Sequence, residues 1–175
     1  HQGIARLHQS TLHNTTKDMK IRRSETAWIS KKSNPARQII ERISKILSVS
    51  HELSEHLQFV RYTTSGFYKP HYDVFCDGFN FPNFKNEYMY GQRYITAIIY
   101  LNDDFTGGET HFPLLKLKVK PQKMSLLVFH NLGNMITKCH PKSLHEGLPV
   151  DGTKYICTIW FREKNYTIKH EDDFL

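Results

Sequence analysis

The hydrophobic pattern of the chain changes at Leu57, and this change limits the folds open to it. Before it, the segment SNPARQIIERISKILSVS (residues 33–50) repeats isoleucine and leucine at helical spacing, with Pro35 suited to the first turn. A second helix is expected within Ile4–Leu12. After Leu57, short alternating or apolar segments are separated by turn residues, which predicts roughly seven or eight strands. They include LQFVRYTT, RYITAIIYLN, GGETHF, KLKVK, MSLLVFHN and KYICTIWFRE.

Helices followed by short strands predict an α+β fold, in which N-terminal helices pack on one sheet of an antiparallel sandwich or barrel. A jelly roll is the natural candidate for such a core. The 175 residues suffice for one domain and are too few for two ordinary ones. We therefore expect a single domain over residues 1–175, with the helices in 1–50 and the β-core in 56–165.

No apolar run approaches the ~20 residues that a membrane span needs. The chain begins without methionine at HQGIARLHQS. We therefore expect a fragment or a processed form from which an upstream targeting segment could have been lost. The compartment cannot be read from the sequence.

The net charge is +7, and much of the excess lies early in the chain. A basic surface attracts nucleic acid, anionic lipid or acidic peptide, and a solvated basic face gives the same pattern. The three cysteines form no CxxC pair, which gives no sign of a zinc or redox motif. Three thiols can form at most one disulfide, and buried or free thiols are the simpler expectation. The early basic residues are Lys17, Lys20, Arg22, Arg23, Lys31 and Lys32, and the cysteines are Cys76, Cys139 and Cys157.

The segment FYKPHYDVF (residues 67–75) places His71 and Asp73 two residues apart, so in an extended chain both side chains point the same way. The best third partner is His145, which lies before a turn containing glycine and proline that leads into a strand. Two imidazoles and one carboxylate on one face of a metal leave three positions open, as in non-haem Fe(II) oxygenases. Zinc in a hydrolytic site could use the same ligands.

Lys154 opens the last strand, and a period of two places it on one face with Ile156, Thr158 and Trp160. An inward ammonium is costly unless an anion pairs with it, and a small carboxylate ligand or a buried Asp or Glu would serve. Tyr62 shares a strand face with Gln58 and Val60, so it could carry a phenol into the same barrel. The long segment 76–92 is expected to be a binding loop or lid.

Four segments resemble the prolyl 4-hydroxylase family of Fe(II)/2-oxoglutarate dioxygenases over almost the whole chain. They carry, in order, HxD, GGET-F, H-x-G-x-P-V and G-x-K, and the early RRSETAWI is similar to the Arg-x-Ser segment of that family. The resemblance implies a double-stranded β-helix, the jelly roll already expected. The four segments are LQFVRYTTSGFYKPHYD, QRYITAIIYLNDDFTGGETHFP, VKPQKMSLLVFHN and SLHEGLPVDGTKYICTIWF.

By the same resemblance, Fe(II) would be held by His71, Asp73 and His145. Lys154 and Tyr62 would hold the distal carboxylate of 2-oxoglutarate, and Thr110 and Trp160 would also line the cosubstrate pocket. The peptide substrate would be held by Arg22, Ser24, Glu55, Tyr68, Arg93 and Trp160. The activity implied is hydroxylation of proline in peptides or proteins with O2 and 2-oxoglutarate, releasing succinate and CO2. L-Ascorbate is the further cofactor implied, and the endoplasmic reticulum lumen the compartment.

The sequence departs from the family pattern at TSG after Tyr62 and at TAWI after Ser24, and the opening strand of the family is expected to be missing. Lysyl hydroxylases and nucleic-acid demethylases are alternatives, but both generally use arginine where this chain has Lys154. A catalytically silent peptide-binding module is the alternative outside enzymes, although such a module would not need all of the polar residues. We expect His111, His130 and His140 to be structural or surface residues. Substrate identity and oligomeric state stay open.

Overall fold

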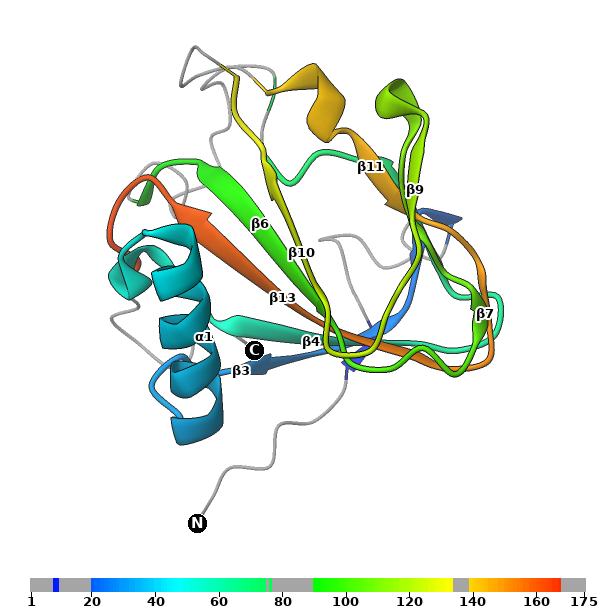
Figure 1. The fold of residues 1–175 in the computed structure, drawn as a ribbon, viewed down its shortest axis with the longest axis horizontal. Coiled ribbons are helices and arrows are strands. Elements are labelled where there is room, and N and C mark those ends of the chain that lie inside the picture. The colour runs from blue at the N-terminus through cyan, green and yellow to red at the C-terminus, as the bar shows by residue number, and fades with distance from the viewer. Residues whose placement is uncertain (1–7, 10–19, 75, 77–89, 134–138, 168–175) are drawn as a thin grey trace.

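The computed structural model describes residues 8–9, 20–74, 76, 90–133 and 139–167, and two antiparallel sheets dominate it (Figure 1). In order across the larger sheet lie β1 (His8–Gln9), β3 (Glu25–Ile29), β4 (Leu57–Tyr62), β13 (Lys154–Arg162), β6 (Arg93–Tyr100) and β10 (Leu126–His130). In order across the smaller sheet lie β2 (Arg22–Arg23), β5 (Phe67–His71), β11 (His145–Gly147), β8 (Thr110–Phe112) and β9 (Leu117–Val119). A separate pair joins β12 (Val150–Asp151) to β7 (Thr106–Gly107).

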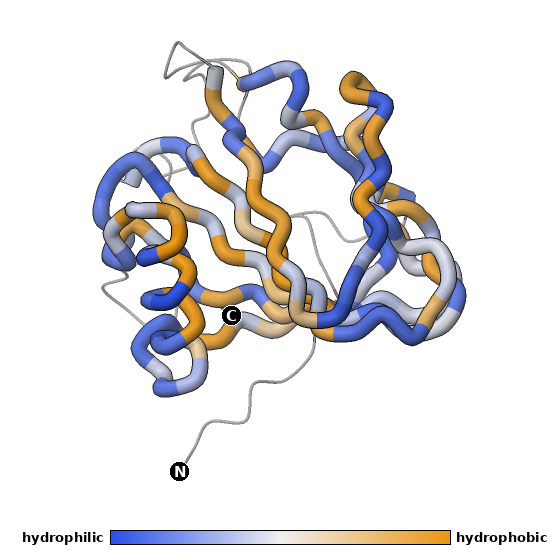
Figure 2. Tube along the Cα trace, viewed as in Figure 1, coloured by the Kyte–Doolittle hydropathy of each residue, from blue (hydrophilic) through white to orange (hydrophobic). Residues whose placement is uncertain are grey.

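The helix α1 (Asn34–Leu47) packs on the outer face of the larger sheet, at the left of Figure 1. Pro35 lies in its first turn, and Ser48 ends it in the left-handed conformation with φ of 56°. Its apolar side faces the strands, as the orange side of the helix in Figure 2 shows, and contributes Ala36, Ile40 and Ile43 to the main core. Three short 3₁₀ helices complete the described elements: η2 (His51–Leu53), η3 (Pro113–Leu115) and η4 (Pro141–Ser143).

Successive side chains of β13 point to opposite faces of the larger sheet, one toward the core that packs against α1 and the other toward the space between the two sheets. Cys157, Ile159 and Phe161 belong to the core beneath α1. The intervening residues face the other way, and the pairing places Lys154 opposite Tyr62 and Trp160 opposite Thr96. The predicted inward face of this strand is therefore confirmed, and it brings polar side chains from three strands to one surface.

The strands expected after Leu57 are found, and α1 confirms the helix expected within residues 33–50, but other parts of the N-terminal region expected to be helical contain strands. His8–Gln9 form a strand within the predicted helix Ile4–Leu12, whose other residues lie outside the described ones. Arg22–Arg23 form β2 and Glu25–Ile29 form β3, and β3 pairs with β4 along its whole length. Sheet pairing there outweighs local propensity, which is a weak guide in short segments. Among the described residues, no helix has the length and apolarity to cross a membrane.

Candidate functional site

A cavity of about 410 Å³ lies between the two sheets. Among the residues that line it are ten of those singled out from the sequence: Arg22, Tyr62, Tyr68, His71, Asp73, Arg93, Thr110, His145, Lys154 and Trp160. Trp28, Gln58, Tyr72 and Thr96 also line it. A larger cavity of about 680 Å³ near α1 shares only Trp28 with the first, so size alone would have pointed away from the polar cluster.

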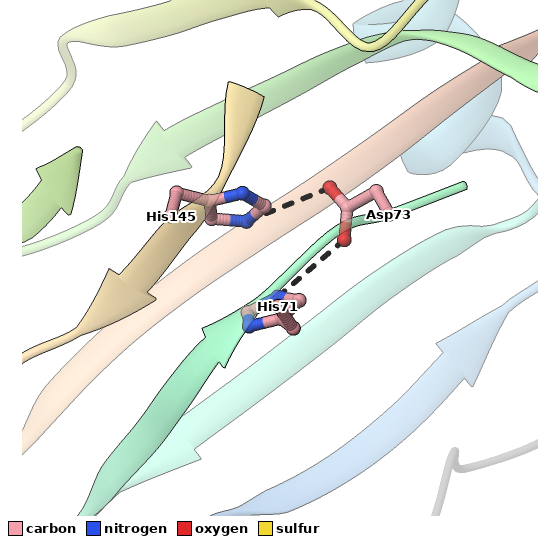
Figure 3. A group of neighbouring side chains, drawn as sticks. All are labelled: His71, Asp73 and His145. Carbon is pink, nitrogen blue, oxygen red and sulfur yellow. Dashed lines mark ion pairs between the residues drawn. The ribbon is translucent and has the colours of Figure 1, made fainter. Parts of the chain in front are cut away.

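His71, Asp73 and His145 converge in this cavity, and one ligand atom from each lies within 4.8 Å of the others. His71 ends β5 and His145 begins β11, and the two are partners in the antiparallel register. Asp73 follows β5 and lies to one side of both imidazoles, with its carboxylate facing each of them, as Figure 3 shows. Its Oδ1 is 3.5 Å from Nε2 of His71, and its Oδ2 is 3.7 Å from Nε2 of His145.

Backbone carbonyls fix the orientation of both imidazoles. Nδ1 of His71 is 2.7 Å from the carbonyl oxygen of Lys69, and Nδ1 of His145 is 2.9 Å from that of Ser143. A carbonyl only accepts, so each Nδ1 carries the proton and each Nε2 presents a lone pair toward Asp73. Two lone pairs and a carboxylate directed at one point form a donor set that a divalent cation would satisfy.

The protonation states of the cluster suit this arrangement. Burial would raise the pKa of Asp73, but the imidazoles of His145 and His71 and a hydrogen bond from the Thr96 hydroxyl outweigh it and hold that pKa below its usual range. Burial lowers the pKa of His145, although the charge of Asp73 offsets part of that change. At neutral pH the cluster therefore consists of an ionised carboxylate and a neutral His145.

Lys154 brings a buried ammonium to the same cavity, with only 4% of its surface exposed. Among the described residues, its Nζ donates to the carbonyl of Gly108 at 2.6 Å and forms no ion pair. The rings of Tyr62 and Tyr100 lie 5.4 and 5.5 Å from Nζ. Burial lowers the pKa of Lys154 to about 8, with part of the loss offset by the charge of Glu109. A buried Asp or Glu that pairs with Lys154, one of the two alternatives given by the sequence, is thus not found among the described side chains.

Gly108 and Thr110 lie near Lys154 in the part of the cavity that surrounds its ammonium group. Gly108 presents its carbonyl to Lys154 from a backbone with φ of 68°, a conformation that favours glycine, and an added Cβ would lie 3.2 Å from Cδ of Lys154. Thr110 shares a hydrogen bond of 2.7 Å with the hydroxyl of Tyr100. The preceding residue, Gly107, also has positive φ.

Trp160 and Arg93 form an aromatic and cationic wall. The Arg93 guanidinium carbon lies 4.1 Å from the centroid of the Trp160 ring, and Trp28 packs beside that ring at 5.9 Å. Trp160 is 7% exposed, and its Nε1 makes no hydrogen bond to any described residue. A buried indole N–H usually has a partner, so a bound ligand could supply one.

Arg22 and Tyr68 lie at the other side of the triad. The Tyr68 ring stacks on His71, with centroids 3.5 Å apart, and Arg22 lies over the same phenol at 4.7 Å. Ser24 and Glu55 do not line the cavity; each instead binds an arginine that does. Ser24 accepts from Nε of Arg22 at 2.7 Å, and Glu55 accepts from Nε and Nη2 of Arg93 at 2.6 and 2.8 Å.

The sequence did not reveal a disulfide between Cys76 and Cys139, which the structure forms. Cys157 is the free, buried cysteine, so the expectation of thiols alone is wrong for the other two. The bridge joins the segment after Asp73 to the segment before His145. Residues 77–89 of the expected loop 76–92 lie outside the described residues, so its role as a lid stays a prediction.

The early basic cluster is partly used within the fold. Lys31 donates to the carbonyls of Glu52, Ser54 and Tyr166 at 3.2, 3.0 and 2.6 Å. Arg22 is engaged with Ser24 and Tyr68, and Lys17 lies outside the described residues. His111 pairs with Glu146 at 2.7 Å, and His130 is exposed, in keeping with their expected structural or surface roles.

Comparison with known proteins agrees with this geometry. Residues 57–162 match the family described as the 2OG-Fe(II) oxygenase superfamily. A protein of Acanthamoeba polyphaga mimivirus named "Putative prolyl 4-hydroxylase" is 41% identical over 86% of this chain and 62% of its own length. Prolyl 4-hydroxylase 1 of Arabidopsis thaliana is 37% identical over 76% of this chain and 50% of its own. The chain thus spans roughly half to three fifths of these relatives.

A solved structure gives the same result. The viral collagen prolyl hydroxylase of Paramecium Bursaria Chlorella virus-1, in its 2OG complex, superposes with a TM-score of 0.68 at 30% identity, over 81% of this chain and 80% of that one. The chain belongs to the 2OG-Fe(II) oxygenase superfamily and, within it, to the prolyl 4-hydroxylase family. The resemblance found in the sequence is confirmed, and the jelly-roll fold of these neighbours accounts for the two facing sheets.

Proposed function

We propose that this chain hydroxylates proline residues in peptides or proteins, using O2 and 2-oxoglutarate and releasing succinate and CO2. The observation that carries the proposal is the joint lining of one cavity by a His-Asp-His cluster and a buried ammonium without a carboxylate partner among the described residues. The names of the relatives support prolyl hydroxylation as the reaction.

Fe(II) fits the cluster formed by His71, Asp73 and His145. Both Nε2 atoms and the Asp73 carboxylate are acceptors that face one another at 3.5 to 3.7 Å, which is favourable only with a cation or proton among them. Two nitrogens and one oxygen would leave three coordination positions for cosubstrate and O2. When bound, Fe(II) and 2-oxoglutarate would supply the chemistry that reduces O2, with one oxygen atom entering a C–H bond of the substrate and the other entering succinate.

2-Oxoglutarate fits the pocket around Lys154. A bound carboxylate would pair with the buried ammonium, and its charge would offset the effect of burial that lowers the pKa of Lys154. Tyr62, opposite Lys154 in the register, and Thr110 line the same cavity and would donate hydroxyl hydrogen bonds to this ligand. The second carboxylate and keto group of the cosubstrate would then extend toward the metal cluster.

The peptide would enter where Arg22, Tyr68, Arg93 and Trp160 line the cavity. Trp160 and Tyr68 offer flat apolar surfaces suited to a pyrrolidine ring, and the two arginines offer donors to peptide carbonyls. Ser24 and Glu55 would act by holding these arginines. The packed aromatic rings would also exclude water from the reacting carbon.

Two further parts of the proposal concern the compartment and the reductant. We propose an oxidising compartment such as the endoplasmic reticulum lumen, which the Cys76–Cys139 disulfide favours. We also propose L-ascorbate as the reductant that restores Fe(II), by similarity to the family.

Turnover tests the reaction directly. Purified chain with Fe(II), ascorbate and 2-oxoglutarate should release succinate when a proline-containing peptide is added, and mass spectrometry should find one added oxygen on proline. The control omits the peptide. If a broad panel of proline, lysine and nucleic-acid substrates gives no turnover while iron is bound, the silent binding module would be the better account. Hydroxylation of lysine alone would replace the proposed substrate.

Lys154→Ala should weaken 2-oxoglutarate binding by about 10- to 100-fold, since hydrogen bonds to a charged group contribute about 1.5–3 kcal/mol. Metal affinity should stay near that of the unchanged chain. Isothermal titration with 2-oxoglutarate and with Mn(II), without O2, measures both. Lys45→Ala removes an exposed lysine of α1 and is the matched control. Equal losses of metal and cosubstrate affinity would make Lys154 a structural residue.

A further inference from the structure

Two buried polar residues outside the cluster reach Asp73 through a hydrogen-bonded chain. Thr96 on β6 and Asn131 just after β10 are both 0% exposed. Nδ2 of Asn131 donates to Oγ1 of Thr96 at 2.7 Å, and Oγ1 of Thr96 donates to Oδ2 of Asp73 at 2.7 Å. The direction is fixed, because the ionised carboxylate only accepts and the Thr96 hydroxyl has a single proton.

The backbone of Asn131 is tied to the segment that carries His145. Its carbonyl accepts from the N–H of His140 at 2.8 Å and from the hydroxyl of Ser143 at 3.4 Å. The carbonyl of Ser143 in turn accepts from Nδ1 of His145. Asn131 therefore neither lines the cavity nor bonds Asp73 or His145 directly, yet it contacts residues that hydrogen-bond to both of them.

We propose that Thr96 and Asn131 are positioning residues that set the geometry of the metal cluster, with Asn131 acting on Asp73 through Thr96. This inference rests on the proposed function, since it assumes that the cluster binds a divalent metal. Metal-binding side chains depend on such outer partners, whose loss typically lowers metal affinity about 10- to 100-fold.

The chain of hydrogen bonds has a specific consequence for Asp73. Thr96 engages Oδ2, so the carboxylate cannot rotate freely and Oδ1 is left as its less encumbered oxygen. This favours binding through one oxygen, which keeps a coordination position open for cosubstrate or O2. Asn131 keeps the Thr96 hydroxyl in the rotamer that donates to Asp73, because the lone pair of Oγ1 must meet Nδ2.

The side chain of Asn131 also has a feature that lowers the stability of the fold and that packing alone does not explain. Its Oδ1 is buried and makes no hydrogen bond to any described residue. An unmet buried acceptor is unfavourable, and an apolar side chain of similar size would avoid it. The amide side chain is explained if its Nδ2 is needed to donate the hydrogen bond to Thr96.

The first test removes one hydroxyl. Thr96→Val keeps the β-branched shape, and the Kd for Co(II) or Mn(II), measured without O2 or substrate, should rise about 10- to 100-fold. Thr96→Ser keeps the hydroxyl and should restore affinity close to that of the unchanged chain. Thr26→Val is the matched control, because Thr26 is buried in the same sheet but does not line the cavity. The Tm of each metal-free variant shows whether the fold is kept.

The second test asks whether Asn131 acts through Thr96. Asn131→Ala retains the backbone contacts to His140 and Ser143, so only the side-chain hydrogen bond is lost, and metal affinity should fall by less than in Thr96→Val. In the double variant, Asn131→Ala should add no further loss to that of Thr96→Val.

Several outcomes would overturn the proposal. They are unchanged metal affinity in Thr96→Val, failure of Thr96→Ser to restore it, and additive losses in the double variant. A lowered metal-free Tm with unchanged metal affinity would likewise assign the pair a purely structural role. If the unchanged chain itself binds no divalent metal, the proposed function fails, which is a different result from equal binding by all variants.

Discussion

The His145→Ala chain should retain no Fe(II) after gel filtration, and its peptide-dependent succinate release should fall to background. The remaining His71 and Asp73 supply only two of the three donors that now lie within 4.8 Å of one another. The loss of metal affinity should therefore exceed the ~10- to 100-fold that loss of an outer partner costs. Iron content by metal analysis and succinate release under saturating 2-oxoglutarate measure the two effects.

His130→Ala is the matched control for this experiment, because it also removes one histidine but from an exposed position on β10. It should keep full iron content. A His145→Ala chain that retains stoichiometric iron would remove His145 from the metal site. A chain that loses iron but keeps turnover would contradict the proposed reaction itself.

The strands that build the cavity could be predicted because their alternation is strong. Lys154, Ile156, Thr158 and Trp160 recur at a period of two, and the structure places them on the inner face of β13. The N-terminal strands were missed because β2 has two residues and β3 five, too few for a periodic signal to outweigh a helical reading. Their strand character comes from pairing with β5 and β4.

The convergence of His71 with Asp73 was predictable from their spacing, and that of His145 followed from family resemblance more than from any local pattern. Thr96 left one signal, since it is a polar residue in the apolar run RYITAIIY on the face of Ile98 and Tyr100. Asn131 and the Cys76–Cys139 bridge left none. Their contacts depend on strands and segments that are distant in the chain and meet only in the folded protein.

Glu55 illustrates a residue whose place the sequence could not define. It matched a peptide-binding position, but the structure buries it to 3% exposure behind Arg93 and Arg162. Oε1 accepts from Nε of Arg93 at 2.6 Å and from Nε of Arg162 at 2.7 Å. Arg93 in turn lies over Trp160 in the cavity wall. Glu55 therefore couples the stability of the fold to the position of a substrate-facing arginine.

Glu55→Ala should lower the free energy of unfolding by about 3–5 kcal/mol, because it leaves the guanidinium of Arg162 buried without its carboxylate. Urea unfolding monitored by fluorescence measures this change. Glu41→Ala is the control, since it breaks an ion pair with Arg37 whose side chains are 36% and 65% exposed, and it should cost no more than about 0.5 kcal/mol. Similar losses in the two variants would contradict a buried, structural Glu55.

The pH dependence of stability separates this role from direct substrate binding. Burial would raise the pKa of Glu55, but the charges and hydrogen bonds of Arg93 and Arg162 outweigh it and lower that pKa below its ordinary value. The folded chain therefore binds a proton less readily than the unfolded chain. The stabilisation is complete above the ordinary pKa of a glutamate and is lost as the pH falls toward the lowered value. Glu55→Gln should flatten this part of the pH profile and raise the KM for peptide, through a displaced Arg93, while metal affinity stays unchanged. A Glu55→Gln chain with unaltered acid sensitivity would show that the two arginines do not depend on its charge.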